Sequence, residues 1–344
     1  MATRPHVGVV STGIYIPATR HTADYIAQET GLPQSVIVDK MGFTQKPVPG
    51  PDDGTAAMGI KAAEMAIQRA GIAPTEIDVV IYIGEEYKEY QLWTAGIKTA
   101  YAVGATSAWA FDVQLRCGTW VLGMKLAEAL MLSDSHVHSV LLAGGYRNGD
   151  FINYKNPRVS FMYNLGAGGA AMLLKKDYGR NRLIGSAMVV DGSLSETVAV
   201  LGGGTKAGLH NHDDKLYQLE ILDVETMKNR LNEVSTPNFI KCVRQVCELE
   251  GYSTKDIGYF AVLHFKKSAH DAMLAELGIP GDRCIYLKDY GHIGQMDQIL
   301  SIHLALEQGK IKDGDLVVGV SAGVGYAWGA TAIKWGPVEE AQRC

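Results

Sequence analysis

The two halves of this chain repeat one another. Residues 71–84, GIAPTEIDVVIYIG, align without a gap on residues 251–264, GYSTKDIGYFAVLH, at an offset of 180 residues. Upstream, residues 56–70 and 236–250 both space their apolar side chains as a helix does. Each half is therefore predicted to contain a helix that ends at a glycine, an acidic turn and a buried strand. The chain is predicted to fold as two copies of one unit.

A second set of paired elements continues the repeat. Each half adds a short apolar strand, a turn with a cysteine or histidine, a helix and another strand. These are 109–113, Cys117, 118–131 and 139–144 in the first half, and 284–287, His292, 295–308 and 316–320 in the second. Short apolar strands that alternate with helices are typical of α/β folds with buried sheets. We therefore predict an α/β fold of two halves, residues 1–176 and 177–344, that share one core.

Composition narrows the class of protein. Of the 344 residues 47% are hydrophobic, which is enough for a large core. The 32 basic residues form no basic run and are outnumbered by 37 acidic residues, which argues against nucleic-acid binding. No apolar stretch approaches the roughly 18 residues that a membrane span needs. The five cysteines are scattered without a CxxC pair, which favours a reduced compartment. We expect a cytoplasmic protein with no membrane segment.

Three residues of the repeat are candidates for catalysis. Cys117 stands at the start of a helix, where unpaired backbone amides and the helix dipole favour a thiolate. His264 ends a buried strand where the first half has Gly84, and His292 is the counterpart of Cys117. Taken alone, Cys117 could simply be a small buried hydrophobic residue, and His264 could be a structural histidine with one hydrogen-bonded ring nitrogen. If a pseudo-twofold axis relates the halves, however, both helix N-termini face one central site, and a thiol with two imidazoles is suited to acyl transfer through a thioester.

Other polar or glycine-rich segments carry weaker signals. Residues 321–329, SAGVGYAWG, could point backbone N–H groups at an oxyanion, although a plain hairpin is the commoner meaning. His210 and His212 resemble a metal cluster but lack a strand or helix to fix them, and residues 202–205 lack the lysine of a phosphate loop. Three acidic residues after a strand are expected in a solvated loop, although one could reach the pocket: Glu85, Glu86 and Glu89.

In combination, these segments resemble the thiolase superfamily, and within it the ketoacyl-ACP synthase III group, the initiating ketosynthases. Residues 111–118, FDVQLRCG, resemble the family's nucleophile segment, and 289–292, DYGH, its Asp-x-x-Gly-Asn turn. Residues 323–329, GVGYAWG, are close to its Gly-Gly-Gly-x-x-Trp-Gly ending, 262–264 carry its histidine, and 166–171, GAGGAA, match its glycine-rich strand entry. The likeness runs through almost the whole chain in order and spacing.

The resemblance implies a thiolase-like, five-layered α-β-α-β-α fold, a homodimer, and an acyl-cysteine intermediate that is resolved by carbon–carbon bond formation. By position, Cys117 takes the acyl group, His264 moves protons or stabilises an enolate, and the backbone amides of Cys117 and Val324 form the oxyanion hole. Coenzyme A or acyl-carrier thioesters would be substrates, with no cofactor and no metal. His292 replaces the family's Asn, and the resulting Cys-His-His trio favours a Claisen reaction without decarboxylation or plain acyl transfer, while decarboxylative condensation stays possible.

The positions that would recognise substrate depart from the family's pattern. The three residues after His264 stand where the family has Gln-Ala-Asn. Val36 and Lys40 stand where the family has the Trp and Arg that hold coenzyme A. The lysines here could meet a phosphate or an acidic carrier protein, and a residue near position 92 would reach across the dimer. The candidate substrate-contacting residues are Lys40, Leu92, Phe265, Lys266 and Lys267.

We therefore expect an acyl-thioester condensing enzyme of the synthase III type, an acyltransferase of lipid or polyketide biosynthesis whose partners are acyl-CoA, an acyl carrier protein, or both. Two alternatives stay open. The enzyme could pass the acyl group on Cys117 to an alcohol or amine. The chain could instead be one subunit of a heteromeric thiolase-like complex, although a silent subunit would not need the cysteine and both histidines.

Overall fold

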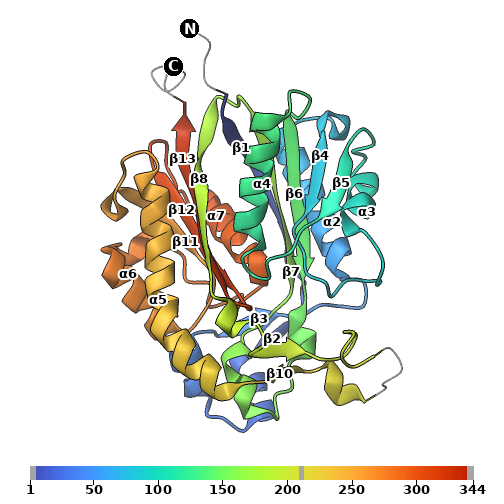
Figure 1. The fold of residues 1–344 in the computed structure, drawn as a ribbon, viewed down its shortest axis with the longest axis vertical. Helices are drawn as coiled ribbons and strands as arrows, with labels where there is room; N and C mark the ends of the chain where they lie inside the picture. The colour runs from blue at the N-terminus through green and yellow to red at the C-terminus, as the bar shows by residue number, and fades with distance from the viewer. Residues whose placement is uncertain (1–4, 209–212, 339–344) are drawn as a thin grey trace.

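The computed structural model describes residues 5–208 and 213–338 and contains a central sheet of nine strands (Figure 1). The strands are β1 (Val7–Tyr15), β4 (Val79–Tyr82), β5 (Trp109–Asp112), β6 (Ser139–Tyr146), β7 (Gly168–Lys176), β8 (Arg180–Val190), β11 (Ile257–Val262), β12 (Leu316–Gly323) and β13 (Ala327–Pro337). They run in the order β11-β12-β13-β8-β1-β7-β6-β4-β5. Two short antiparallel pairs lie outside this sheet, β2 (Arg20–Thr22) with β3 (Gln45–Pro47) and β9 (Val198–Val200) with β10 (Leu219–Ile221).

The strand order repeats once within the sheet. In the first half β1 pairs antiparallel with β7, β7 antiparallel with β6, and β6 parallel with β4. In the second half β8 pairs antiparallel with β13, β13 antiparallel with β12, and β12 parallel with β11. The two sets meet at one residue pair, Gly8 with Arg182. The repeated pairing is what a duplication predicts, whereas the boundary between residues 176 and 177 stays a prediction.

One expected strand is missing from the second half. We matched residues 284–287 to β5, but this segment forms no strand. The guanidinium of Arg283 donates a hydrogen bond to the backbone carbonyl of Ile257 in the edge strand β11, at 2.7 Å. A side chain thus occupies part of the edge where a further strand would pair, which is one way in which proteins cover a sheet edge.

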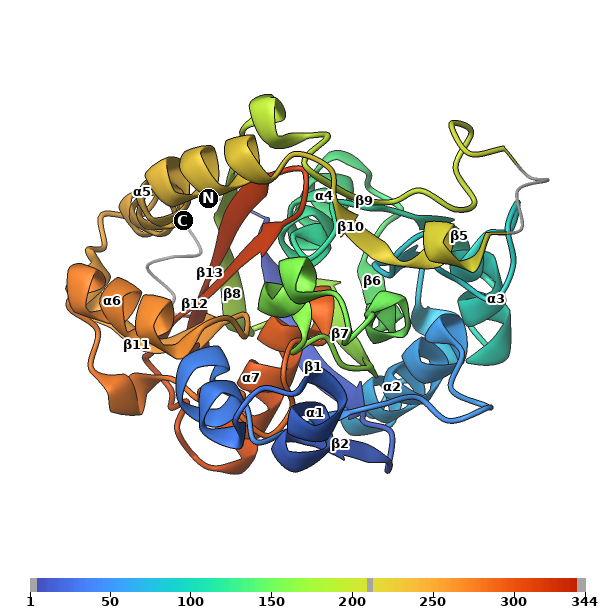
Figure 2. The ribbon, with the colours of Figure 1, turned by 90° about the horizontal axis from the view of Figure 1, so that it is seen from below.

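The helices form three layers around the two parts of the sheet (Figure 2). The helices are α1 (Ala23–Thr30), α2 (Thr55–Ala70), α3 (Ala95–Ala102), α4 (Thr119–Ser133), α5 (Val224–Glu248), α6 (Lys267–Leu277) and α7 (Asp297–Glu307). Helices α2 and α3 pack on the strands of the first half, and α5 and α6 cover those of the second. Helices α4 and α7 contact strands of both halves, so they form the middle layer. The arrangement is the five-layered α-β-α-β-α fold that the resemblance implied.

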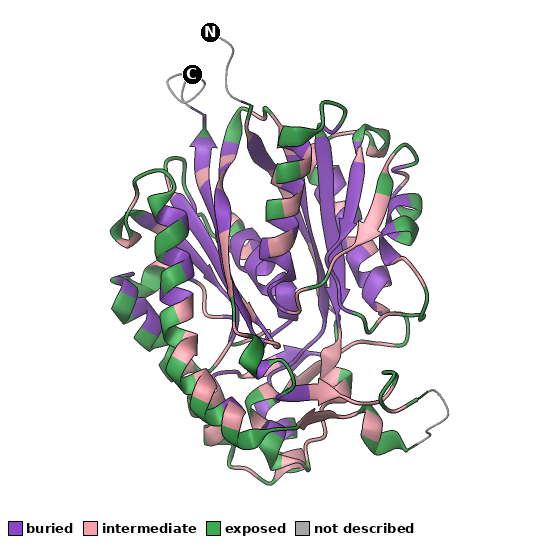
Figure 3. Ribbon diagram, in the orientation of Figure 1, coloured by how far each residue is buried: buried purple, intermediate pink, exposed green. Residues whose placement is uncertain are grey.

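Of the two middle helices, α7 lies inside the molecule, whereas α4 has one exposed face (Figure 3). Helix α7 is buried from Asp297 to His303, although it carries several polar side chains. These have partners: the amide of Gln298 donates to the carbonyl of Val320 at 3.0 Å, and His303 contacts the hydroxyl of Thr12 at 3.0 Å. Because buried polar groups are costly without partners, these bonds fix the rotation of α7 in the core. The start of α7 is therefore held firmly at the centre.

Glycines let strands and helices approach closely. A Cβ added to Gly319 of β12 would overlap the ring of Trp120 in α4, and one added to Gly145 of β6 would overlap the backbone carbonyl of Thr55 in α2. The 39 glycines therefore serve close packing inside strands as well as tight turns. In the described part of the chain, no helix is long and apolar enough to cross a membrane.

Candidate active site

Cys117 lies in a tight turn between β5 and the N-terminus of α4. Arg116 has a left-handed backbone with a φ of 52°, and the Leu115 N–H donates to the Thr119 hydroxyl at 2.8 Å, so the turn is held locally. The side chain of Cys117 is nearly enclosed, since the residue is 8% exposed. The hairpin between β12 and β13 covers the turn, because a Cβ on Gly323 would overlap the carbonyl of Leu115 and lie 3.2 Å from the amide nitrogen of Cys117.

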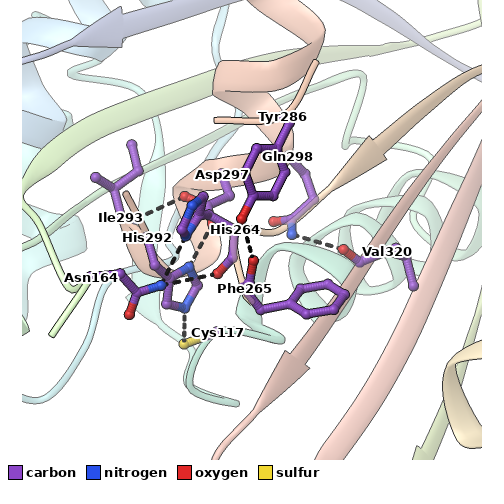
Figure 4. Close-up of polar contacts among 10 residues, drawn as sticks. All are labelled: Cys117, Asn164, His264, Phe265, Tyr286, His292, Ile293, Asp297, Gln298 and Val320. Atoms are coloured by element: carbon purple, nitrogen blue, oxygen red, sulfur yellow. Dashed lines mark hydrogen bonds and ion pairs between the residues drawn. The ribbon is translucent and has the colours of Figure 1, made fainter. Parts of the chain in front are cut away.

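Cys117, His292 and Asp297 form one chain of hydrogen bonds (Figure 4). The Sγ of Cys117 lies 3.1 Å from Nε2 of His292, and Nδ1 of His292 lies 2.5 Å from Oδ2 of Asp297. A carboxylate accepts hydrogen bonds, so Nδ1 carries a proton and Nε2 faces the sulfur. This is the arrangement of a nucleophile, its base and the carboxylate that orients the base.

The carboxylate of Asp297 is fixed on both oxygens. Its Oδ1 accepts from the backbone N–H of Ile293 at 2.8 Å, and its Oδ2 also accepts from the backbone N–H of His264 at 2.7 Å. Asp297 is completely buried. The side chain thus ties the turn that carries His292 to the end of β11, and it cannot swing away from the imidazole without breaking several bonds.

The site favours a charged His292. Burial alone would lower the pKa of this imidazole, but the charges of Asp297 and Cys117 and its hydrogen bonds to both hold the pKa well above the ordinary value of 6.5. His292 is therefore an imidazolium at neutral pH. A cation next to the sulfur of Cys117 is what a nucleophilic thiolate requires.

His264 lies in the same cluster, but both of its ring nitrogens are paired with groups other than the thiol. Its Nε2 lies 3.1 Å from the carbonyl of Gly42, which can only accept, so Nε2 carries the proton. Its Nδ1 accepts from the side-chain amide of Asn164 at 2.9 Å. Burial lowers the pKa of His264 to about 4, so the ring is neutral. The sequence predicted His264 beside Cys117 and His292; the structure joins it to them through Asp297, and its proposed role in proton transfer stays a prediction.

Two residues of the cluster were missed in the sequence. Asp297 is an acid near the start of the helix predicted over residues 295–308, five positions after His292, and that spacing was the available signal. Asn164 belongs to no recognisable motif. Its backbone carbonyl accepts a hydrogen bond from the backbone N–H of His292 at 2.9 Å. The backbone N–H of Gly166 donates to the backbone carbonyl of His292, also at 2.9 Å. The strand entry around residue 166 thus supports the histidine turn from the other half of the chain.

The predicted oxyanion and substrate residues have different surroundings. Val324 follows Gly323 in the hairpin that covers the Cys117 turn. The predicted substrate contacts divide into exposed and packed side chains. Lys40, Lys266 and Leu92 are exposed, Lys267 pairs with Asp271 and lies 5.4 Å from the ring of Tyr286, and Phe265 stacks on Phe239 with ring centroids 5.8 Å apart. Their roles in binding stay predictions. His210 and His212 lie outside the described residues.

The three glutamates after β4 have different environments. Glu86 is half-exposed, and Glu89 accepts from the backbone N–H of Ala57 at 3.1 Å, which caps the start of α2. Glu85, however, is buried beside the Cys117 turn. The expectation of a solvated loop was therefore wrong for Glu85, because turns distant in sequence enclose the end of β4.

Protonation of His264 is expected to destabilise the protein in acid. Its pKa is about 6.5 in an unfolded chain and about 4 here, so the unfolded state takes up the proton first as the pH falls below 6.5. The free energy of unfolding should drop by about 3 kcal/mol from this group between pH 7 and pH 4. Urea denaturation of wild type and His264→Gln at both pH values measures the difference. Equal pH dependence in the two proteins would contradict the buried neutral imidazole.

Comparison with known proteins identifies the family. Residues 111–192 match the sequence model of 3-oxoacyl-[acyl-carrier-protein] synthase III, and residues 247–335 match that of its C-terminal part. The chain belongs to the 3-oxoacyl-[acyl-carrier-protein] synthase III family of condensing enzymes, which are acyltransferases.

Relatives extend over nearly the full length. The beta-ketoacyl-[acyl-carrier-protein] synthase III of Sphingopyxis alaskensis is 24% identical over 325 residues, which cover 94% of this chain and 97% of that protein. The structure of the synthase III of Pseudomonas aeruginosa PAO1 is similar with a TM-score of 0.84 and 20% identity, over 96% of this chain and 98% of that one. The priming β-ketosynthase of the R1128 polyketide pathway has a TM-score of 0.85 and 18% identity, over 98% of both chains. These structural likenesses establish the shared fold.

Proposed function

We propose that this enzyme transfers an acyl group from a thioester to Cys117 and then joins that group to a second thioester by a Claisen-type reaction. The observation that carries the proposal is the Cys117–His292–Asp297 chain of hydrogen bonds at the start of the two central helices. The donors are coenzyme A or acyl-carrier thioesters, and the exposed Lys40 and Lys266 are the side chains for a phosphate or an acidic carrier surface. Four buried free cysteines suit the reduced cytoplasm.

In the first step the sulfur of Cys117 attacks the thioester carbonyl of the donor. The charge that develops on the carbonyl oxygen would be met by the backbone N–H groups of Cys117 and Val324. When the tetrahedral intermediate collapses, the bond to the donor sulfur breaks and the leaving thiolate takes the proton from Nε2 of His292. Asp297 holds the ring in the required orientation throughout.

In the second step the second thioester loses an α-proton or carbon dioxide, and the resulting enolate or carbanion attacks the acyl group on Cys117. The proton that restores the imidazolium of His292 comes from that α-carbon or, after loss of carbon dioxide, from solvent. A carbon–carbon bond forms, the bond between the carbonyl carbon and Sγ breaks, and the thiolate returns to its place beside His292. His264 is held by Gly42 and Asn164 and is neutral, so it adds no charge to the site in which this step takes place.

The test separates condensation from simple acyl transfer. Acetyl-, octanoyl- and dodecanoyl-CoA are each supplied with malonyl-CoA or acetyl-CoA as the second thioester, and products are identified by mass spectrometry. A 3-oxoacyl thioester supports the proposal. Release of coenzyme A only when an alcohol or amine is added would assign acyl transfer to that acceptor instead, a reaction that the same three side chains can catalyse.

We also propose a homodimer formed through β5. This strand is at the edge of the sheet, and apolar side chains on it and on α3 are open to solvent: Ile97 at 59%, Tyr101 at 76% and Trp109 at 49% exposure. Exposed apolar side chains on an unpaired edge are typical of an interface. Light scattering should give a dimer for wild type and a monomer for Trp109→Arg, whereas Leu249→Arg, at an exposed position just after the end of α5, should stay dimeric. A monomeric wild type would contradict the proposal.

A further inference from the structure

Asn164 contacts both histidines of the site, each with a different group. It lies between the short helical turn Pro157–Met162 and β7, in the first half of the chain. Its backbone carbonyl accepts from the backbone N–H of His292 at 2.9 Å. Its side-chain nitrogen Nδ2 lies 2.9 Å from Nδ1 of His264 and 3.4 Å from the backbone carbonyl oxygen of the same residue (Figure 4). One residue of the first half thus holds two histidines of the second.

The backbone contact does not explain why this residue is an asparagine. Every residue has a backbone carbonyl, so any side chain would leave the bond to His292 in place. The side chain of Asn164 is almost fully enclosed, since the residue is 7% exposed, and its Oδ1 has no hydrogen-bond partner among the described residues. A buried amide with an unpaired oxygen is costly, and an apolar side chain would avoid that cost. The bond from Nδ2 to His264 is therefore the feature that requires an amide.

The direction of the bond between Asn164 and His264 follows from the other side of the ring. Nε2 of His264 lies 3.1 Å from the backbone carbonyl oxygen of Gly42, which only accepts, so Nε2 carries the proton. Nδ1 of the neutral ring is then an acceptor, and the amide nitrogen of Asn164 is the donor that faces it. The 3.4 Å contact between Nδ2 and the carbonyl of His264 agrees, because that oxygen also only accepts. A carboxylate at position 164 would be an acceptor in the same place and would favour a proton on Nδ1.

Three other close neighbours of His264 neither donate to its ring nor accept from it. The rings of Phe43 and Tyr286 lie 6.3 Å and 5.0 Å away between centroids, and the Tyr286 hydroxyl donates to the backbone carbonyl of Phe265 at 2.7 Å. The carboxylate of Asp297 accepts from the backbone N–H of His264 instead of the ring. Burial lowers the pKa of the ring to about 4, although the charge of Asp297 raises it. With an amide N–H on Nδ1, His264 is a poor base and a hydrogen-bond donor through Nε2.

We propose that Asn164 is a positioning residue for the condensation step, because its amide holds the ring of His264 neutral with the proton on Nε2. This inference rests on the proposed function and concerns its second step, since acylation uses Cys117, His292 and Asp297. As the enolate of the second thioester forms, negative charge develops on its carbonyl oxygen, and a fixed N–H donor stabilises that charge. The Nε2–H of His264 supplies this donor, which is one of the two roles that the resemblance implied for it. No proton leaves His264, so its tautomer is the same before and after the step.

The first test removes the amide in Asn164→Leu, a variant of nearly the same size, with Asn232→Leu at an exposed position of α5 as the control. Loss of one oxyanion donor costs about a hundred- to a thousand-fold, so the 3-oxoacyl product formed with malonyl-CoA or acetyl-CoA should fall by about a hundred-fold. The acyl adduct on Cys117 after incubation with octanoyl-CoA should stay within about threefold of wild type, because acylation does not use His264. The control should match wild type in both quantities.

The second test measures the protonation of His264 by ¹⁵N NMR, with its signals assigned from their loss in His264→Gln. At pH 7 the wild-type ring should be neutral, with the proton on Nε2 and Nδ1 as an acceptor. Asn164→Asp puts an acceptor where the amide donor was, so Nδ1 should also hold a proton and the ring should be charged at pH 7. A change in folding alone would not produce this difference between the two proteins.

Several results would overturn this role for Asn164. Product within threefold of wild type in Asn164→Leu would exclude it from the condensation step, and an equal loss of acylation would make the residue purely structural. A wild-type ring with its proton on Nδ1, or a neutral ring in folded Asn164→Asp, would contradict the direction of the bond. If neither variant folds, the wild-type spectrum decides, since it needs no change at position 164. A wild type without an adduct on Cys117 or without 3-oxoacyl product would count against the proposed function instead, and the spectrum would still test the bond.

Discussion

Replacing Cys117 by alanine is expected to abolish acylation and condensation. The structure places this sulfur 3.1 Å from Nε2 of His292 in a nearly closed turn, and no other described cysteine has such a partner. Removal of a covalent nucleophile from such a chain lowers turnover by about a million-fold in comparable sites, so activity should fall below detection. Release of coenzyme A and formation of 3-oxoacyl thioester are measured by chromatography.

Cys284→Ala is the matched control for this prediction. Cys284 is also buried near a histidine, but burial raises the pKa of its thiol to about 11, and its sulfur is 3.9 Å from Nε2 of His270. An unionised thiol is a poor nucleophile. The control should keep wild-type activity, and activity above a tenth of wild type in Cys117→Ala would contradict the assignment of the nucleophile.

Asp297→Asn is expected to lower acylation of Cys117 by about ten-thousand-fold, which is the typical cost of replacing the carboxylate of such a triad by an amide. An asparagine amide in the same place can donate to Nδ1 of His292, which moves the ring proton to Nε2 and blocks acceptance from the thiol. Without the negative charge, burial would also lower the pKa of the imidazole. Asp297 acts through His292 and is a positioning residue.

The protonation state of His292 is measured in this variant, because it depends on the carboxylate of Asp297 and not only on whether the protein folds. NMR of ¹⁵N-labelled histidines should show His292 as an imidazolium at pH 7 in wild type and as a neutral ring in Asp297→Asn. Asp297→Glu should recover part of the rate, since it restores the charge. The exposed Asp313→Asn is the control and should change neither quantity. An Asp297→Asn protein that is folded, keeps a charged His292 and acylates at the wild-type rate would contradict the triad.

The internal duplication was the sequence feature from which the order of helices and strands in the fold could be predicted. Gap-free alignment of 71–84 with 251–264 places β4 and β11 at equivalent positions, and the structure shows the same strand order around each. Symmetry then predicts that the two middle helices begin near each other, which is why the pairing of Cys117 with His292 could be expected. Periodicity and glycine position are local signals, and local signals suffice for element order.

The details of the site depend on contacts that no local pattern reveals. An acid in the first turn of a helix is ordinarily explained by the helix dipole, so Asp297 did not stand out until the rotation of α7 was known. The ring of His264 is oriented by Gly42 and Asn164, which are 222 and 100 residues away. Glu85 is enclosed by the Cys117 turn and tied to the His292 turn in the same non-local way.

The most direct test of this account is the mass of the peptide that contains Cys117. The protein is incubated with acetyl-, octanoyl- and dodecanoyl-CoA and with the corresponding acyl-carrier thioesters, quenched in acid and digested. The account predicts that this peptide gains the mass of the acyl group from at least one donor and loses it on treatment with hydroxylamine, which cleaves thioesters. An unmodified Cys117 peptide with every donor, or an adduct carried by another cysteine while Cys117 stays free, would contradict it.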